Sequence, residues 1–253
     1  MSRMRRATNE DTAFCSLLWG DKPHYILEAM VSGFTLMQHC EKKRILFVDQ
    51  ILIDSGWSSL LKIFWDVRVF EHYDAGSKQE CTQVRLRNVW SKMLPWKLLA
   101  GKISVALMLD TDTLVRRNID YASKNLTHAD RQGAYRGAGE WSLTTPRPSS
   151  TIKAAENQWG KVGPGGRNTG GDINVGAVLM KPNVDTFNEM SDVLRHKHRP
   201  PDRTCAEQDF WPRPFAAHWH ERLGELDASL NFQTHQPSLS VPDRLCLQKL
   251  DSC

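Results

Sequence analysis

The chain alternates between short unbroken apolar runs and stretches in which apolar residues recur every three or four positions. Runs of the first kind are typical of strands buried on both faces of a parallel sheet, and the second spacing is typical of helices with one apolar face. The predicted strands are 14–19, 45–48, 67–70, 105–109, 134–136 and 173–180. The predicted helices are 23–38, 57–64, 84–100 and 184–196. This alternation predicts an α/β fold, a mixed and mainly parallel sheet flanked by helices.

Two features refine this arrangement. Pro95 falls inside the third predicted helix and predicts a kink or break there, because proline lacks the amide that the helix interior needs. A length of 253 residues suits one domain with a substantial core. We expect an N-terminal extension at 1–12, the main domain at 13–235 and a C-terminal tail at 236–253, because the periodicity weakens after residue 231.

Composition excludes several classes of protein. The net charge is only +4, and the basic clusters at 3–6, 42–44 and 195–199 lack interleaved aromatic residues, so nucleic acid is not an expected partner. The six cysteines form no Cys-x-x-Cys pair, which favours reduced thiols. Neither a signal peptide nor an apolar run long enough to span a bilayer is visible, and we therefore expect a cytoplasmic protein.

The strongest candidate for chemistry follows the apolar run at 105–109. This run stops at Asp110, and Asp112 lies one residue further on. Parallel sheets bind ligands beyond the carboxyl ends of their strands, and alternate strand residues point the same way. Two carboxylates at such an end suit Mn²⁺ or Mg²⁺ on a diphosphate. Taken alone, the pattern fits a structural turn equally well, since aspartate also begins turns.

The aspartate pattern belongs to a series of five segments along the chain. They are Ser91-Lys-Met-Leu-Pro-Trp96, Leu109-Asp-Thr-Asp-Thr-Leu-Val115 with Asn118-Ile-Asp120, Asn174-Val-Gly-Ala-Val-Leu-Met-Lys-Pro182, Ala206-Glu-Gln-Asp-Phe210, and a weaker block of Ser16-Leu-Leu18 with Tyr25. Together they span residues 16 to about 231. In content and order they resemble the glycogenin-like and galactinol-synthase-like retaining glycosyltransferases of family 8.

The resemblance implies a single GT-A-type nucleotide-sugar transferase domain. Its activity would move a hexose from a UDP-sugar donor to a hydroxyl acceptor, which is a sugar, a polyol or a protein, with Mn²⁺ or Mg²⁺ as cofactor. The residues that it assigns to the ion are Asp110 and Asp112. Those that it assigns to the donor are Lys92, Asp110, Thr111, Asp112, Asn174, Gly176, Leu17 and Tyr25. Those that it assigns to catalysis are Glu207 and Gln208.

Each role has a simpler structural reading. Lys92 by composition alone is an exposed helix lysine, Tyr25 a packing residue and Glu207 a first-turn helix carboxylate. An Asn-x-Gly segment such as the one beginning at Asn174 is often only a turn. Because an amide does not ionise, Gln208 is a poor nucleophile, which favours attack by the acceptor on the same face as the departing diphosphate.

The sequence also departs from the family pattern. The family closes its metal shell with a histidine in a His-x-x-Gly-x-x-Lys-like segment, which this chain lacks, and His218, His220 and His235 are weak substitutes. Glu28 stands where the family usually has glycine. A second hypothesis is therefore a catalytically impaired protein that binds sugar nucleotides. A third is a phosphohydrolase with an aspartyl nucleophile, although that pattern requires Gly-Thr-Leu after the second aspartate and Asp112 is followed by Thr-Leu-Val. The oligomeric state is left open.

Overall fold

The computed structural model describes residues 12–73, 88–122, 135–139, 173–196, 223–225 and 247–249. Its strands are β1 Thr12–Leu18, β2 Lys43–Val48, β3 Asp66–Val69, β4 Val105–Leu109, β5 Thr113–Val115, β6 Tyr135–Gly139, β7 Ile173–Met180, β8 Leu223–Glu225 and β9 Leu247–Lys249. Its helices are α1 Pro23–His39, α2 Gln50–Asp54, α3 Ser58–Leu61, the 3₁₀ helix η3 Val89–Met93, α4 Leu94–Leu98 and α5 Val184–His196.

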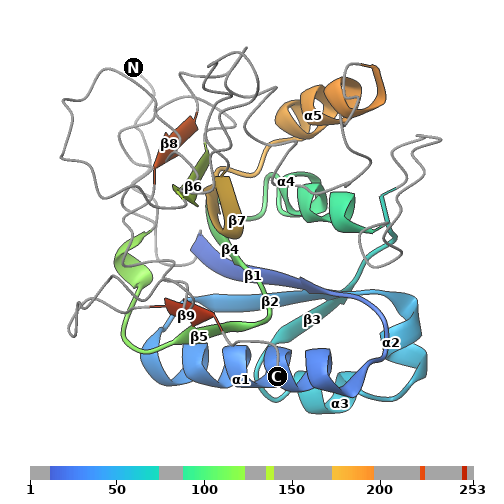
Figure 1. The fold of residues 1–253 in the computed structure, drawn as a ribbon, viewed down its shortest axis with the longest axis vertical. Helices are drawn as coiled ribbons and strands as arrows, with labels where there is room; N and C mark the ends of the chain where they lie inside the picture. Colours follow the sequence, from blue (N-terminus) through green and yellow to red (C-terminus); the bar gives the residue numbers. More distant parts are fainter. Residues whose placement is uncertain are drawn as a thin grey trace, which may run out of the picture.

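Within these ranges, seven strands form one sheet in the order β3-β2-β1-β4-β7-β6-β8 (Figure 1). The pairs β1–β2, β2–β3, β1–β4 and β6–β8 are parallel, whereas β7 runs antiparallel to both β4 and β6. The expected mixed, mainly parallel sheet is thus confirmed. β1 and β4 are buried along their whole length, as their unbroken apolar runs require for central strands.

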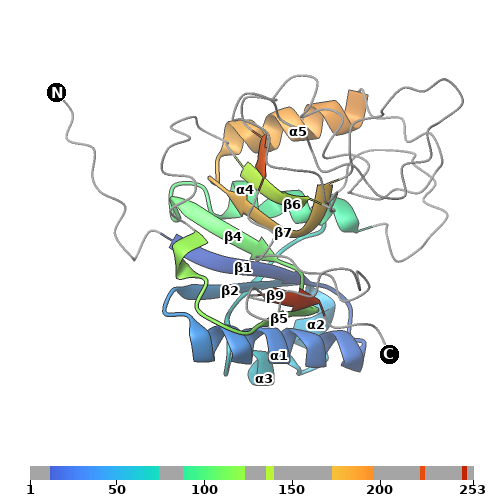
Figure 2. The same ribbon diagram turned by 60° about the vertical axis from the view of Figure 1, so that its left-hand side comes forward.

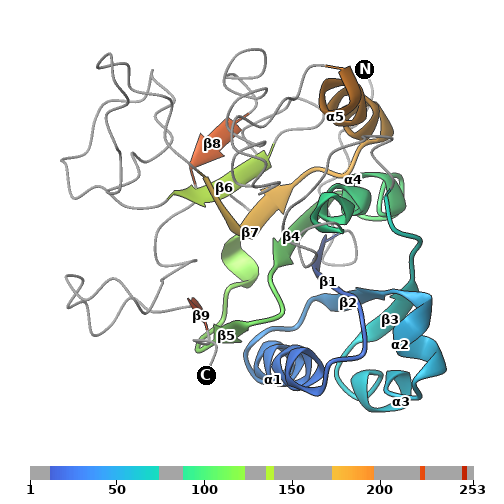
Figure 3. The ribbon, with the colours of Figure 1, turned by 45° about the vertical axis from the view of Figure 1, so that its right-hand side comes forward.

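Helices cover both faces of this sheet. In all three ribbon views α1 and α3 lie on one face, and α4 and α5 lie on the other (Figures 1, 2 and 3). Successive residues of β1 point to opposite faces, so that Cys15 joins the core beneath α4 and α5 while Phe14 joins the core over α1. Among the residues that the structure describes, the largest fully buried side chain is Trp96 of α4.

The helix expected around Pro95 is broken in the predicted place. The 3₁₀ helix η3 leads into α4, and Pro95 lies in the first turn of α4, where its missing amide leaves no helical hydrogen bond unmade. This arrangement presents Lys92 from η3 and buries Trp96 in α4.

Two parts of the structure differ from the pattern-based expectation. The predicted helix at 57–64 is preceded by a separate helix, α2, which the Asp49 side chain caps by accepting the amide hydrogen of Leu52 at 3.1 Å. Gly56, with φ of 81°, ends this turn and separates α2 from α3. In addition, β9 lies inside the segment predicted as a tail and pairs with β5. This strand is only three residues long, too short to produce a periodic pattern in the sequence.

None of the helices in the described ranges is long and apolar enough to cross a membrane.

The buried Cys15 thiol predicts a pH dependence of stability. Cys15 is free and fully buried, and burial raises the pKa of its thiol above the ordinary value of 9.0. When the pH exceeds 9.0, the Cys15 thiol loses its proton in the unfolded chain but keeps it in the folded chain. The free energy of unfolding should therefore fall as pH rises, by up to about 1.4 kcal/mol per pH unit. Urea unfolding between pH 7 and 10 should show a steeper decline for the native chain than for Cys15→Ala. Parallel curves would contradict this assignment.

Candidate active site

The carboxyl ends of four neighbouring parallel strands meet at one edge of the sheet. β3, β2, β1 and β4 all point the same way, and each is followed within three residues by a glycine or a polar side chain. These residues are Gly20 after β1, Asp49 after β2, His72 after β3 and Asp110 after β4. Open α/β sheets bind ligands at such an edge.

The acidic pair lies on a tight turn between β4 and β5. The Asp110 amide donates a hydrogen bond to the Gly176 carbonyl of β7 at 2.9 Å, which extends the β4–β7 pairing by one residue. The Thr113 amide then donates to the Asp110 carbonyl at 3.2 Å, so that Thr111 and Asp112 form the corner of the turn. The Oδ1 atom of Asp112 is buried. Backbone hydrogen bonds at the start and at the end of the turn therefore fix the backbone that carries the two aspartates.

Lys92 lies against this turn. Its Nζ is 2.7 Å from Asp110 Oδ1, and the two side chains are 12% and 20% exposed. A pair so shielded from water interacts more strongly than a surface ion pair, since fewer water molecules screen the charges. The residues around Lys92 in η3 are buried and fix the helix on the core. The structure thus brings together Lys92 and Asp110, which the sequence placed in one site.

A second polar cluster at the same edge was not predicted. The His72 ring lies 3.3 Å from Asp49 Oδ2 through Nε2 and 3.3 Å from Ser91 Oγ through Nδ1. The Asp49 carboxylate also accepts the Gly20 amide at 2.9 Å, and Ser91 Oγ accepts the Tyr73 amide at 3.0 Å. The side chains of Asp49 and Ser91 are buried.

This cluster connects the ends of three strands to the helix that carries Lys92. Because Ser91 precedes Lys92, the contacts made by His72 hold that part of η3 beside the ends of β2 and β3. One member had a signal in the sequence, since Asp49 directly follows an apolar strand just as Asp110 does. Ser91 stood in the segment 91–96 that carries the family resemblance, but without a role. His72 had no signal, because its contacts join residues far apart in the chain.

Two of the expected donor residues lie near the end of β1. Tyr25 is in the first turn of α1 and is 37% exposed, but its ring already contacts His24 at a centroid distance of 4.0 Å, and Lys22 Nζ lies 5.9 Å from the ring centre. Leu17 is buried in the apolar core, which leaves only its backbone for a ligand.

The other expected residues are less fully described. Gly176 lies in β7 and holds Asp110 through its carbonyl. The backbone of Asn174 is in β7 next to an irregularity in the pairing with β6, and its side chain lies outside the described part. Glu207 and Gln208 also lie outside the described residues, as do the three histidines considered as metal ligands.

The donor chemistry of the acidic turn fits a hard divalent cation. Asp110 and Asp112 supply carboxylate oxygens, and Mg²⁺-like ions are commonly held by one or two carboxylates, with water and substrate phosphate filling the other positions. Among the described residues no group of three or more Asp, Glu, His or Cys side chains gathers at one place. The described part therefore shows two aspartates on one turn, with an ammonium group paired to the first of them.

No protein-family model matches the chain, and no curated protein matches it. Solved structures do. The chain is similar to the apo structure of the bifunctional glycosyltransferase WbbM, with a TM-score of 0.59 and 11% identity over 99% of this chain and 47% of that one. It is also similar to the apo glycosyltransferase GlyE of Streptococcus pneumoniae TIGR4, with a TM-score of 0.55 and 14% identity over 95% of this chain and 54% of that one.

A third similar structure is the galactosyltransferase LgtC in complex with donor and acceptor sugar analogs. The TM-score is 0.58 at 12% identity, over 95% of this chain and 87% of that one. The chain spans about half the length of WbbM and GlyE. At these identities the likeness concerns the fold, and the chain has the fold of the GT-A glycosyltransferases.

Proposed function

We propose that this chain is a metal-dependent retaining glycosyltransferase that moves a hexose from a UDP-sugar to a hydroxyl acceptor. The observation that carries the proposal is the ion pair between Lys92 and Asp110 at the carboxyl edge of a GT-A sheet. At this edge, the carboxylates of Asp110 and Asp112 would bind a cation, and the ammonium group of Lys92 would bind phosphate. Such a combination suits the departure of a nucleoside diphosphate, whose negative charge grows as the bond to the sugar breaks.

The residues in and around the turn would have different functions in donor binding. Asp110 and Asp112 would hold Mn²⁺ or Mg²⁺, which when bound supplies Lewis-acid neutralisation of the diphosphate. Lys92 would place a compact positive charge against the same phosphates, and its ion pair with Asp110 keeps the ammonium group at the turn. Thr111 would expose its backbone at the corner of the turn, and Gly176 would keep Asp110 in place through its carbonyl.

The rest of the site is carried over from the family resemblance. Asn174 would bond a sugar hydroxyl and Tyr25 would contact the uracil, while the backbone of Leu17 would border the nucleotide. Glu207 and Gln208 would lie on the sugar, with Gln208 beside the anomeric carbon on the face opposite the diphosphate. Since glutamine is a poor nucleophile, the acceptor hydroxyl would attack from the side that the diphosphate leaves, which retains the configuration.

A second function is favoured by the metal donor set. Within the described ranges no third Asp, Glu, His or Cys side chain groups with Asp110 and Asp112, and the other carboxylate at this edge, Asp49, is paired with His72. A protein that binds the sugar nucleotide without transferring the sugar would need no more than this. The phosphohydrolase hypothesis gains no such support, because the similar structures are glycosyltransferases.

Incubation with a panel of UDP-sugars and Mn²⁺, with UDP release as the readout, separates these functions. A transferase releases UDP with at least one donor and releases it faster with its acceptor. A protein that only binds sugar nucleotides should bind added UDP in isothermal titration calorimetry and should release no UDP from UDP-sugars above background. If the native chain neither releases UDP from any donor nor binds UDP, both proposed functions are contradicted.

Removing the ammonium group of Lys92 should slow UDP release strongly. We expect Lys92→Met to lower kcat by roughly 100-fold or more, which is the usual loss when one preorganised electrostatic group is removed. Lys92→Arg keeps the charge but changes its shape and should retain part of the rate. Circular dichroism of each variant checks folding, because the mostly buried Asp110 also loses its partner. Equal rates for Lys92→Met and the native chain would exclude this role.

A further inference from the structure

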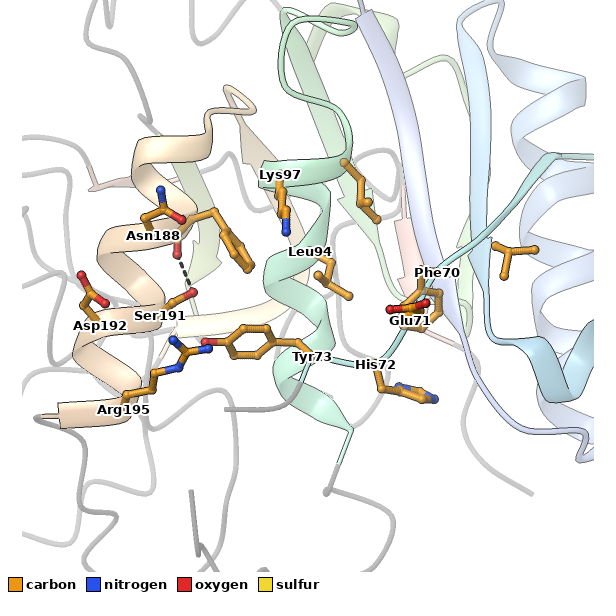
Figure 4. A pocket seen from close by; sticks show the side chains of 13 residues that line it. Phe70, Glu71, His72, Tyr73, Leu94, Lys97, Asn188, Ser191, Asp192 and Arg195 are labelled. Carbon is orange, nitrogen blue, oxygen red and sulfur yellow. Dashed lines mark hydrogen bonds between the residues drawn. The ribbon is translucent and has the colours of Figure 1, made fainter. Parts of the chain in front are cut away.

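A cavity separate from the acidic turn lies between α4, α5 and the segment that follows β3 (Figure 4). Its volume is about 720 Å³, within the usual range for small-molecule sites. Besides His72 and Ser191, whose side chains are hydrogen-bonded within the protein, its polar lining comes from Glu71, Tyr73, Lys97, Asn188, Asp192 and Arg195. None of the residues proposed for the donor or the metal lines it.

Two aromatic rings hold the cationic groups of this cavity in place. Tyr73 and Phe187 meet edge to face, with ring centres 5.5 Å apart. Lys97 Nζ lies 5.5 Å from the centre of the Phe187 ring, and the Arg195 guanidinium carbon lies 5.8 Å from the centre of the Tyr73 ring. Such cation–π contacts restrict both long side chains, so that their N–H groups stay near the cavity wall.

The Tyr73 hydroxyl gives an independent sign of a missing partner. In Figure 4 the Tyr73 ring extends from the segment after β3 toward α5, and its hydroxyl end lies near Arg195. Within the structure as described, this hydroxyl oxygen is buried and makes no hydrogen bond. A buried hydroxyl without a partner is costly, and a ligand group that donates or accepts a hydrogen bond would remove that cost.

The charges around the cavity select the kind of ligand. Lys97 and Arg195 supply two positive charges, and Glu71 and Asp192 supply two negative ones, so the wall has no net charge. A nucleotide or another polyanion would gain from the two cations but would be repelled by the carboxylates. Hydroxyl groups match all of these residues, because each can donate to a carboxylate and accept from an ammonium or guanidinium group.

We propose that this cavity binds a short neutral oligosaccharide. The amide of Asn188 and the Tyr73 hydroxyl would add two neutral hydrogen-bonding groups to the four charged ones. The proposal does not depend on the acidic turn or on the proposed transfer reaction, since no residue proposed for the donor, the metal or catalysis lines the cavity. His72, which does line it, belongs to the neighbouring polar cluster with Asp49 and Ser91. The proposal predicts a sugar-binding site that functions in the absence of metal and of nucleotide.

Isothermal titration with maltotriose, cellotriose and raffinose, without metal or UDP, tests this proposal. At least one should bind with a Kd on the order of 1 mM or tighter. Tyr73→Phe removes only the hydroxyl and should weaken that binding roughly fivefold to tenfold, the usual effect of one hydrogen bond. Lys97→Gln should also weaken it. Lys62→Gln, which changes an exposed lysine after α3, is the matched control and should bind as the native chain does.

Three results would overturn the proposal. The first is no binding of any of the three sugars. The second is binding that Tyr73→Phe and Lys97→Gln leave unchanged, since the sugar would then be bound elsewhere. The third is binding of a zwitterionic dipeptide such as glycylglycine in place of the sugars. Asp110→Asn should leave sugar binding intact while it abolishes UDP release, so failure of one proposal is distinguishable from failure of the other.

Discussion

Replacement of Asp110 by asparagine is expected to lower UDP release by a factor of at least about 100, the loss typical of removing one electrostatic contact to the transition state. The amide keeps the size of the side chain but removes the charge that pairs with Lys92 and that we propose binds the metal ion. The backbone hydrogen bonds of the turn, from the Asp110 amide to the Gly176 carbonyl and from the Thr113 amide to the Asp110 carbonyl, do not involve this side chain and should keep the turn in its shape. Asp112→Asn is expected to act in the same direction.

Asp66→Asn is the matched control for these two variants. Asp66 is an exposed carboxylate at the start of β3 that pairs with Arg68 at 2.6 Å. Exposed pairs of this kind contribute little to stability, so its loss should leave both folding and UDP release close to those of the native chain. If Asp110→Asn retains the native rate, or if Asp66→Asn loses as much, the assignment of the acidic turn is wrong.

Replacement of Gly33 by alanine is expected to destabilise the fold by about 3 kcal/mol. Gly33 lies in α1 against the buried Trp65, and a Cβ placed there would come within 2.1 Å of Trp65 Nε1 and 2.6 Å of Trp65 Cε2. The indole cannot easily move, because its Nε1–H donates to the Ala29 carbonyl at 2.8 Å. Urea unfolding at neutral pH measures the loss.

A double-mutant cycle shows whether the indole is the cause. In a Trp65→Leu background the indole ring is gone, and Gly33→Ala should then cost much less than in the native chain. It should even stabilise this variant by up to about 1 kcal/mol, because alanine favours helix over glycine. An equal cost of Gly33→Ala in both backgrounds would contradict the packing described.

The parts of the fold that sequence patterns predicted are those with local signals. β7 and α5 occur at the expected residues. The last six residues of β7 are apolar or glycine without a break, and the apolar residues of α5 recur at helical spacing over several turns. β4 followed by Asp110 was likewise predicted from an apolar run that stops at a carboxylate. The break near Pro95 follows from the chemistry of proline alone.

The parts that were missed depend on contacts between distant residues. β9 requires β5 as a partner. α2 is the exception, because its Asp49 cap is local and the helix was missed for being only five residues long. The bonds of His72 to Asp49 and Ser91 arise only when the ends of β2 and β3 meet η3. A single histidine after a strand gives no indication of this in the sequence. The cations held over Tyr73 and Phe187 in the second cavity are missed for the same reason.

The binding of UDP in the presence and absence of Mn²⁺, measured by isothermal titration calorimetry, tests the central claim most directly. The claim is that the acidic turn at Asp110 and Asp112, together with Lys92, holds a cation and a nucleoside diphosphate at the carboxyl edge of the sheet. The account predicts that Mn²⁺ strengthens UDP binding to the native chain and has no such effect on the Asp110→Asn, Asp112→Asn variant. UDP binding that is absent, or that is equal with and without Mn²⁺ in both proteins, would contradict it.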